Sequence, residues 1–310
     1  MKNIDHLFQE YVWECEFSRK LRPETIKGYN DIYSTFRKLK PDADLKNISP
    51  SAITDFFRIL NERERIVGRG RVKIGVKKST IATYWSKLNN FFVWLEARKA
   101  IADNPFRHMK FPAPVYLDRQ FLKKDEVEKI FTAIYSHHND SLLILKRNLL
   151  MFTMLLFCGL RREELLLLQV RDFDIERRLV TIRAETSKSG ISRRIPLASS
   201  VIIALKDYLI QRREYTTQFL FVSSIRDRQF SYAGAKHLVD SLSAKSGVKF
   251  HMHQFRHTFA TNFLKQSNNI YKLKELMGHR DIRMTAVYLR GLPTAELRGD
   301  VEKMSFDALI

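Results

Sequence analysis

Apolar residues recur every three or four positions through the first hundred residues, a spacing that places them on one face of a helix. The repeats run over residues 4–15, 26–36, 53–60 and 81–95. Ser51, which follows Pro50, and Ser79 are start signals for the last two, because a serine side chain accepts a hydrogen bond from the first backbone N–H groups of a helix. We therefore predict four helices that pack into a small helical domain.

Proline-rich sequence ends this pattern. Pro105, Pro112 and Pro114 follow one another closely, and proline both lacks an amide donor and restricts the residue before it. We place the domain boundary here. The prediction is a helical domain over residues 1–110, a linker over 111–115 and a second domain over 116–310.

The second domain mixes two periodicities. Helical spacing covers residues 123–136, 142–157, 201–213, 233–244, 253–265 and 270–277. Between these segments, residues 179–184 and 193–197 alternate in the manner of strands, and Ser187-Lys188-Ser189-Gly190 is a turn sequence that joins them. The predicted fold class is mainly α with a small β-sheet.

The charge of the chain indicates a polyanionic partner. Lys and Arg number 54 against 34 Asp and Glu, a net charge of +20 that runs along the whole sequence, and such a field favours nucleic acid. No stretch approaches the roughly 18 uninterrupted apolar residues of a membrane span. Cys15 and Cys158 form no Cys-x-x-Cys pair, which argues against a disulfide framework or a thiolate zinc site. We expect a cytoplasmic protein that binds nucleic acid and no membrane.

One stretch concentrates this charge. Residues 63–78 contain seven Arg and Lys, three Gly and no acid after Glu64. A solvated loop is the ordinary interpretation of such a stretch, but the charge of the rest of the chain favours contact with phosphates, and the glycines suggest a loop that orders only on DNA. The predicted DNA-binding residues are Arg69, Arg71, Lys73, Lys77 and Lys78.

Two motifs place an arginine on a helix face with a polar partner. Arg161 and Glu164 are three positions apart, so the carboxylate can hold the guanidinium for two parallel hydrogen bonds to a phosphate. A plain surface ion pair explains the same spacing. His253 and Arg256 repeat it on a helix with a large apolar face, where a charged arginine needs an anionic partner. His257 makes zinc the alternative there, although no third ligand is apparent and Arg256 would repel a cation.

His279, Tyr288 and Lys188 complete the candidate chemistry. Nine positions separate His279 from Tyr288, half a turn out of phase on a continuous helix, so the two side chains meet only if the helix breaks. Gly278 and Asp281 supply that break. Taken alone, Tyr288 is an ordinary half-buried tyrosine and Lys188 a solvated hairpin lysine. A lysine at that tip can instead reach a DNA groove and protonate a leaving oxygen, which arginine, with its higher pKa, does poorly.

These groups form one ordered set: Arg in Gly-Leu-Arg-x-x-Glu-Leu, a hairpin Lys, His-x-x-Arg-His, Leu-Met-Gly-His, and a Tyr nine residues after that His. The set resembles the tyrosine recombinase family, also called the phage integrase family, and within it the Xer-like proteins. The resemblance is close over residues 116–288 and loose over the N-terminal domain. It implies a SAM-like helical core-binding domain followed by a mixed α/β catalytic domain.

The resemblance also implies a reaction and a role for each group. Tyr288 would attack a DNA phosphate and form a 3′-phosphotyrosyl link, with His253 as its base, since a phenol with the ordinary pKa of about 10 is hardly ionised at neutral pH. Lys188 would be the general acid and Glu164 a support for Arg161. The phosphate oxygens would be bound by Arg161, Arg256 and His279. Because one phosphodiester is exchanged for another, neither a metal nor another cofactor is required.

The implied function is site-specific recombination of double-stranded DNA, in Xer-like dimer resolution or in the integration and excision of a mobile element. It would be carried out by a homodimer on one site and a homotetramer at synapsis, with residues 292–310 docking as a tail on their own or a neighbouring subunit. The chain departs from Xer-like relatives at Leu289-Arg290-Gly291, where Thr-His is usual, and at Phe255, where leucine is usual. The alternatives are a type IB topoisomerase-like enzyme that relaxes DNA and a basic DNA-binding protein without catalysis.

Overall fold

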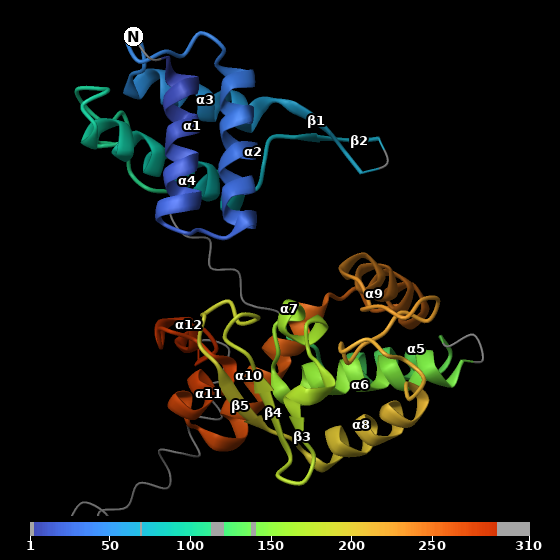
Figure 1. Cartoon of the computed structure of the whole chain (residues 1–310). Coiled ribbons are helices and arrows are strands. Elements are labelled where there is room, and N and C mark those ends of the chain that lie inside the picture. The colour runs from blue at the N-terminus through green and yellow to red at the C-terminus, as the bar shows by residue number, and fades with distance from the viewer. Residues whose placement is uncertain (1–2, 69, 113–120, 138–140, 290–310) are drawn as a thin grey trace, which may run out of the picture. The chain divides into compact units, whose positions relative to one another are not determined.

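The computed structural model describes residues 3–68, 70–112, 121–137 and 141–289. The chain divides into two units, Met1–Leu117 and Asp118–Ile310 (Figure 1). The linker that we predict over residues 111–115 falls next to this division, but it continues into residues outside the described ranges. In the described residues the fold is mainly helical with two small sheets, which confirms the predicted fold class.

The described part of the first unit contains four α-helices, at the positions that the apolar repeats predict. They are α1 Ile4–Trp13, which continues as the π-helical turn η1 Glu14–Ser18, α2 Pro23–Leu39, α3 Pro50–Glu62 and α4 Lys78–Ala97. Asn3 and Ser49 cap α1 and α3 by accepting hydrogen bonds from His6 N and Ala52 N. The core between these helices is rich in buried aromatic side chains, among them Tyr11, Phe36, Phe56, Phe91 and Phe92.

A two-stranded ribbon leaves the first unit between α3 and α4 (Figure 1). β1 Glu64–Val67 and β2 Arg71–Ile74 pair antiparallel, with Arg65 opposite Lys73 and Ile66 opposite Val72. Because successive side chains of a strand point to opposite faces, one face of the ribbon is basic and the other is apolar.

The expectation of a loop over residues 63–78 was wrong, because β1 and β2 form a hairpin there, while ordering on DNA stays a prediction. Gly68 and Gly70 adopt left-handed backbone angles, with φ of 58° and 76°, and these angles close a hairpin turn. The β-branched residues that alternate with the cations favour strands on both sides of it. Arg69, one of the predicted DNA-binding residues, lies outside the described residues.

A buried helix organises the second unit. α6 Leu142–Cys158 packs against α5 Lys124–Tyr135, α8 Ser199–Gln211 and α10 Met252–Ser267. Ser141 caps its start, accepting a hydrogen bond from Ile144 N. Gly159 ends it with a φ of 58°, and a Cβ added there would lie 2.2 Å from the ring of Phe259. Only glycine therefore allows the chain to leave α6 in the direction that it takes.

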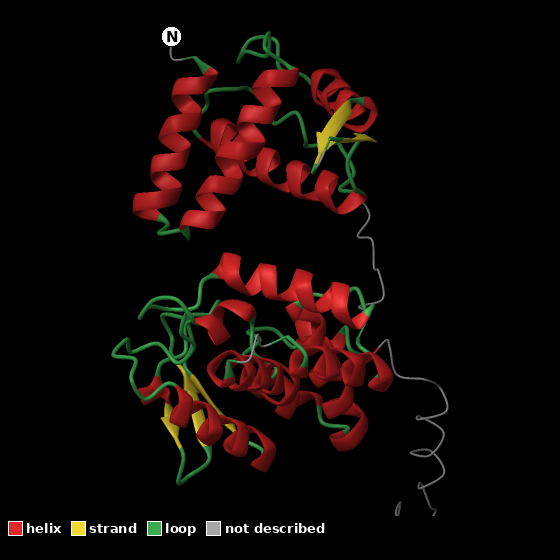
Figure 2. Cartoon of the chain, turned by 90° about the vertical axis from the view of Figure 1, so that its right-hand side faces the viewer, coloured by secondary structure: helices red, strands yellow, loops and turns green. Residues whose placement is uncertain are grey.

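The remaining elements follow the predicted order, with small additions. The helices are α7 Arg162–Leu166, α9 Tyr232–Ser246, α11 Ile270–Met277 and α12 Arg283–Ala286. After the 3-10 turn η2 Val170–Asp172, strands β3 Phe173–Asp174, β4 Leu179–Ile182 and β5 Arg193–Pro196 form an antiparallel sheet in that order. Figure 2 shows this sheet at one side of a largely helical unit. The predicted strands β4 and β5 are confirmed, and β3 is an addition.

No helix in the described part of the chain is both long and apolar enough to cross a membrane.

Candidate active site

Arg161 and Glu164 form the start of helix α7. Arg161 is the residue that caps the helix, and its backbone N–H donates to Glu164 Oε2 at 2.9 Å. Its guanidinium Nη1 donates to Glu164 Oε1 at 2.8 Å. The three-residue spacing that predicts a shared helix face therefore lets Glu164 accept hydrogen bonds from both the backbone and the side chain of the residue that begins the helix, which is one half of a capping box. Glu164 is only 1% exposed, so its carboxylate is a fixed acceptor inside the protein.

Arg193 is a second cation on the same carboxylate, and sequence reasoning missed it. It begins strand β5, and its Nη1 and Nη2 donate to the two oxygens of Glu164 at 3.1 and 2.8 Å. Its Nε donates to the carbonyl oxygen of Leu276 at 2.9 Å. The available signal was strand alternation, because Arg193 lies on the same face of β5 as the buried Ile195.

The ionisation of Glu164 reflects this double pairing. Burial raises the pKa of the Glu164 carboxyl, but the hydrogen bonds and charge of Arg193, together with the backbone N–H and charge of Arg161, outweigh it and lower the pKa to about 2. The carboxylate is therefore negative throughout the neutral range.

Arg256 approaches the same carboxylate from helix α10. It is 1% exposed, and its Nη1 lies 4.0 Å from Glu164 Oε2. Nη1 donates to the carbonyl oxygen of Gly159, and Nη2 donates to that of Met277 at 2.7 Å. Burial and the charge of Arg161 lower the pKa of Arg256 to about 9, while Glu164 and Tyr288 act in the opposite direction. The guanidinium thus stays charged at neutral pH.

His279 links Arg256 to the last short helix. Its Nε2 lies 3.0 Å from Arg256 Nη2 and its Nδ1 lies 2.8 Å from Thr285 Oγ1. Arginine can only donate, so Nε2 is the acceptor in this contact. A neutral His279 then carries its proton on Nδ1 and donates it to Thr285.

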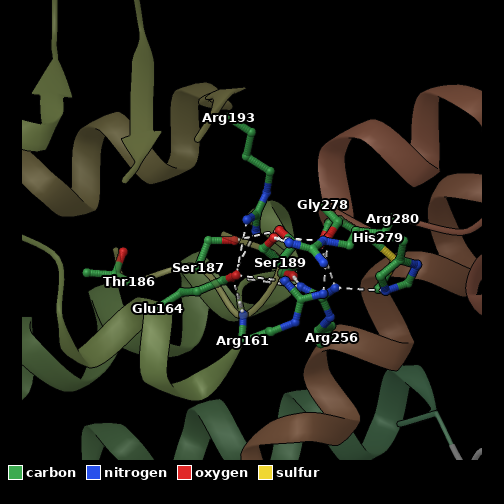
Figure 3. A network of polar contacts seen from close by, with 12 residues as sticks. Arg161, Glu164, Thr186, Ser187, Ser189, Arg193, Arg256, Gly278, His279 and Arg280 are labelled. Atoms are coloured by element: carbon green, nitrogen blue, oxygen red, sulfur yellow. Dashed lines mark hydrogen bonds and ion pairs between the residues drawn. The ribbon is translucent and has the colours of Figure 1, made fainter. Parts of the chain in front are cut away.

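The end of helix α11 and the turn after it contact all three arginines of this network (Figure 3). The Gly278 carbonyl accepts from Arg161 Nη2 at 3.2 Å, and His279 follows directly. Gly278 has a φ of 62°, and a Cβ added there would lie 2.9 Å from Nη1 of Arg193. Glycine is thus required both by the backbone angle and by the close approach of a guanidinium.

The loop between β4 and β5 carries Lys188 beside this turn. Ser187 and Ser189 are buried, with their hydroxyl oxygens 2.8 Å apart, whereas Lys188 between them is exposed. Arg280 Nε donates to the carbonyl oxygen of Ser189 at 2.8 Å. The predicted hairpin tip is therefore packed against the segment that contains His279.

Tyr288 lies next to His257 of helix α10. Its hydroxyl is 3.0 Å from Nδ1 of His257, and the tyrosine is 4% exposed. The His257 ring also meets the ring of the exposed His253 edge to face, with 4.4 Å between centroids. No cluster of three or more His, Cys, Asp and Glu able to hold a metal occurs among the described residues.

The predicted site residues thus come from five separate segments of the second unit. Arg161, Glu164, Arg256 and His279 are joined by direct contacts. Lys188, Tyr288 and His253 are connected to them through four further residues, three of which sequence reasoning missed, whereas it considered His257 only as a zinc ligand. These are Arg193, His257, Arg280 and Thr285. The predicted DNA-binding residues Arg71, Lys73, Lys77 and Lys78 are exposed in the first unit.

Replacing Glu164 with glutamine is expected to destabilise the second unit in a pH-dependent manner. A folded pKa of about 2 against the ordinary 4.5 corresponds to about 3 kcal/mol. This contribution is fully present above pH 4.5 and is lost as the pH falls toward 2. Glu164→Gln should therefore lower the free energy of unfolding by about 3 kcal/mol at pH 7, and the difference from wild type should shrink below pH 4.5.

Urea unfolding followed by far-ultraviolet circular dichroism tests this expectation. All three tryptophans, Trp13, Trp85 and Trp94, lie in the first unit, so their fluorescence provides an internal reference that should not shift. The matched control is Glu163→Gln at the exposed neighbouring position. An equal loss of stability in both variants, or a difference that is independent of pH, would contradict the role of Glu164.

Comparisons with known proteins place the chain among its relatives. A "Tyrosine recombinase" of Pseudothermotoga lettingae is 27% identical, over 93% of this chain and 94% of its own length. A "Tyrosine recombinase XerC" of Bacillus subtilis is 25% identical, over 93% and 91%. Among solved structures, the Tn1549 transposon integrase in complex with transposon right-end DNA shares the fold, with a TM-score of 0.77, 18% identity and coverage of 98% of this chain and 99% of that one.

Residues 120–294, more than half of the chain, match the phage integrase family. This match contains every residue of the arginine, histidine and tyrosine network described above. The chain therefore belongs to the phage integrase family and is a tyrosine recombinase, an enzyme that transfers DNA strands.

Proposed function

We propose that this chain recombines double-stranded DNA at specific sites by covalent exchange of phosphodiesters, with Tyr288 as the nucleophile. The observation that carries the proposal is the charge of the buried network. Three guanidinium groups, those of Arg161, Arg193 and Arg256, surround the single carboxylate of Glu164. The net charge of +2 is desolvated and lies in the same unit as a buried tyrosine.

This net charge suits a phosphoryl transition state better than a resting phosphodiester. A phosphodiester carries one negative charge, and attack by a phenolate adds a second. A fixed charge of +2 therefore stabilises the transition state more than the bound ground state, which is the condition for catalysis. Arginine also offers several N–H donors in a fixed plane that matches phosphate oxygens.

The proposed reaction conserves bonds and protons. The phenolate oxygen of Tyr288 bonds to phosphorus, the bond from phosphorus to the 5′ oxygen breaks, and Lys188 gives that oxygen a proton. Reversal by a different 5′ hydroxyl rejoins the strand. His253 is the base that the sequence predicts, and its ring meets that of His257. His279 becomes a phosphate donor only when Nε2 carries a proton, because the neutral ring accepts from Arg256 there.

We further propose that the ribbon of the first unit binds DNA. Arg71 and Lys73 lie on its basic face, and Lys77 and Lys78 follow at the start of α4, all of them exposed. A two-stranded ribbon has a width that a DNA groove admits. Cations on a projecting ribbon reach phosphates without rearrangement of the helical core.

Recombination of two duplexes requires four strand breaks, and each chain offers one Tyr288. We therefore propose a homodimer on each site and a homotetramer at synapsis. The tail beyond Leu289, which we expect to dock on its own or a neighbouring subunit, lies outside the described residues. Dimer resolution and mobile-element transfer use the same chemistry, and the DNA that flanks the gene decides between them. Family membership does not favour a topoisomerase or a binder without catalysis.

The covalent step has a direct test. Nicked duplexes with a randomised central segment are incubated with the protein, and adducts that survive denaturant are isolated and sequenced. We expect the wild type to give such adducts, because a nick lets the 5′ fragment leave and traps the phosphotyrosine. Tyr288→Phe should give none, whereas Tyr271→Phe, at a tyrosine that is 71% exposed on α11, should behave as wild type. If Tyr288→Phe also gave adducts, another residue would be the nucleophile.

The ribbon proposal predicts a change in salt dependence. Each bound phosphate releases counterions, so affinity falls as salt rises. The slope of log affinity against log salt becomes shallower by about 0.9 for every phosphate that the protein no longer binds. The double variant Arg71→Ala, Lys73→Ala should reduce the magnitude of this slope by about 2. The slope is measured by fluorescence anisotropy on duplex DNA. The charge-preserving pair Arg71→Lys, Lys73→Arg is the control and should keep the slope. An unchanged slope in the alanine variant would mean that the ribbon does not touch DNA.

A further inference from the structure

Arg280 holds the backbone next to Lys188. Its Nε donates to the carbonyl oxygen of Ser189 at 2.8 Å, and its Nη2 donates to the same oxygen. Two donors on one carbonyl define the direction of that peptide better than a single bond does. Arg280 immediately follows His279, which contacts Arg256. The two hydrogen bonds from Arg280 therefore connect the Lys188 loop to the arginine network (Figure 3).

The loop is fixed on the other side of Lys188 as well. Ser187 N–H donates to the carbonyl of Arg183 at 3.0 Å, and Gly190 N–H donates to the carbonyl of Ser187 at 3.0 Å. The hydroxyls of Ser187 and Ser189 are 2.8 Å apart, and both residues are buried. Between these two buried serines, the side chain of Lys188 is exposed to solvent.

We propose that Arg280 is a positioning residue for Lys188, and this inference rests on the proposed role of Lys188 as the proton donor. A lysine side chain has four rotatable bonds, so its ammonium finds the leaving oxygen efficiently only from a fixed backbone. Without the side chain of Arg280, the carbonyl of Ser189 loses its charged partner and the backbone at Lys188 is free to move. Proton transfer to the leaving oxygen then slows, while phosphate binding by the arginines persists.

The test separates proton donation from all other effects of the substitution. Suicide duplexes are made from a sequence recovered in the adduct selection, with either oxygen or sulfur as the bridging 5′ atom. A thiolate leaves without protonation, so the sulfur substrate needs no general acid. Arg280→Ala should cleave the oxygen substrate at least about tenfold more slowly than wild type and the sulfur substrate at nearly the wild-type rate.

Two controls complete the experiment. Arg283→Ala removes a neighbouring arginine whose side chain is 88% exposed and pairs with Asp281, and it should cleave both substrates normally. Lys188→Ala should show the same rescue by sulfur as Arg280→Ala. If sulfur fails to rescue Lys188→Ala, the proposed acid is wrong. If sulfur rescues Lys188→Ala but not Arg280→Ala, the role of Lys188 as the general acid is supported and the positioning role of Arg280 is refuted.

A second inference concerns the tyrosine and is carried by a different contact. Tyr288 and His257 are both buried, at 4% and 7% exposure, and the hydroxyl is 3.0 Å from Nδ1 of the imidazole. His257 neighbours Arg256 in sequence, and Tyr288 is near enough to Arg256 to raise its pKa. The imidazole therefore touches the proposed reacting atom beside the cationic network, whereas His253 meets His257 from the exposed side.

We infer that His257 takes the proton from Tyr288, given the proposed role of Tyr288 as the nucleophile. The neutral ring, protonated on Nε2, accepts the phenolic proton at Nδ1 and becomes imidazolium as the oxygen to phosphorus bond forms. The proton returns to the phenolic oxygen when the strand is rejoined. His253 is then a neighbour of the charged ring rather than the base itself.

Matched variants and a modified phenol test this assignment on the oxygen substrate. Asparagine at position 257 can place a hydrogen-bonding atom near that of Nδ1 but cannot accept a proton at neutral pH, so His257→Asn should slow adduct formation about a hundredfold. Introducing a fluorinated tyrosine at position 288 makes the phenol more acidic and should recover most of that loss. His237→Ala, at an exposed histidine of α9, should have no effect.

Each result decides the question. A normal rate in His257→Asn would show that the contact is a hydrogen bond without proton transfer and would overturn the inference. A slow rate that the fluorinated phenol does not recover would assign His257 a structural role and would also overturn it. If the wild type forms no adduct with any duplex of the pool, the proposed function fails before His257 is tested.

Discussion

One buried negative charge holds the arginine network of the candidate site together. The carboxylate of Glu164 pairs with Arg161 from its own helix turn and with Arg193 from strand β5, and Arg256 comes within 4.0 Å from helix α10. Three cations at such distances repel one another strongly in a medium of low polarity. The single carboxylate among them offsets part of this repulsion and holds the three guanidinium groups in fixed positions. The relative positions of α7, β5 and α10 therefore depend on this group as much as on apolar packing.

Backbone carbonyls supply most of the other partners. Arg161 contacts Gly278 O, Arg193 contacts Leu276 O and Arg256 contacts Gly159 O and Met277 O. These oxygens lie at the ends of helices α6 and α11, where the last carbonyls have no partner within the helix. Helix ends thus give the guanidiniums acceptors that leave the net charge unchanged. The site keeps its charge of +2 while every arginine is anchored.

Much of this arrangement follows from sequence, and the parts that do not have a common cause. Apolar spacing predicts α6 and α10 because helices bury one face, and the turn sequence around Lys188 predicts the hairpin of β4 and β5. The ribbon was missed because its cations masked short β-branched strands. Arg193 and Arg280 were missed, and His257 was considered only as a zinc ligand, because their partners are a distant carboxylate, a peptide carbonyl and a phenol. Such contacts have no fixed sequence separation, so only the folded chain brings them together.

Burial decides how strongly the network acts on a substrate. Desolvation lowers the pKa of Arg256 to about 9, which means that its charge is held at a cost but persists at neutral pH. A desolvated cation interacts with an incoming anion far more strongly than a hydrated one, because little water has to be displaced and the local dielectric is low. The free energy needed to desolvate Arg256 is supplied when α6, α10 and α11 fold, before DNA binds. The proposed function thus assigns the stabilisation of a doubly charged phosphorane to groups that are already in place in the folded chain.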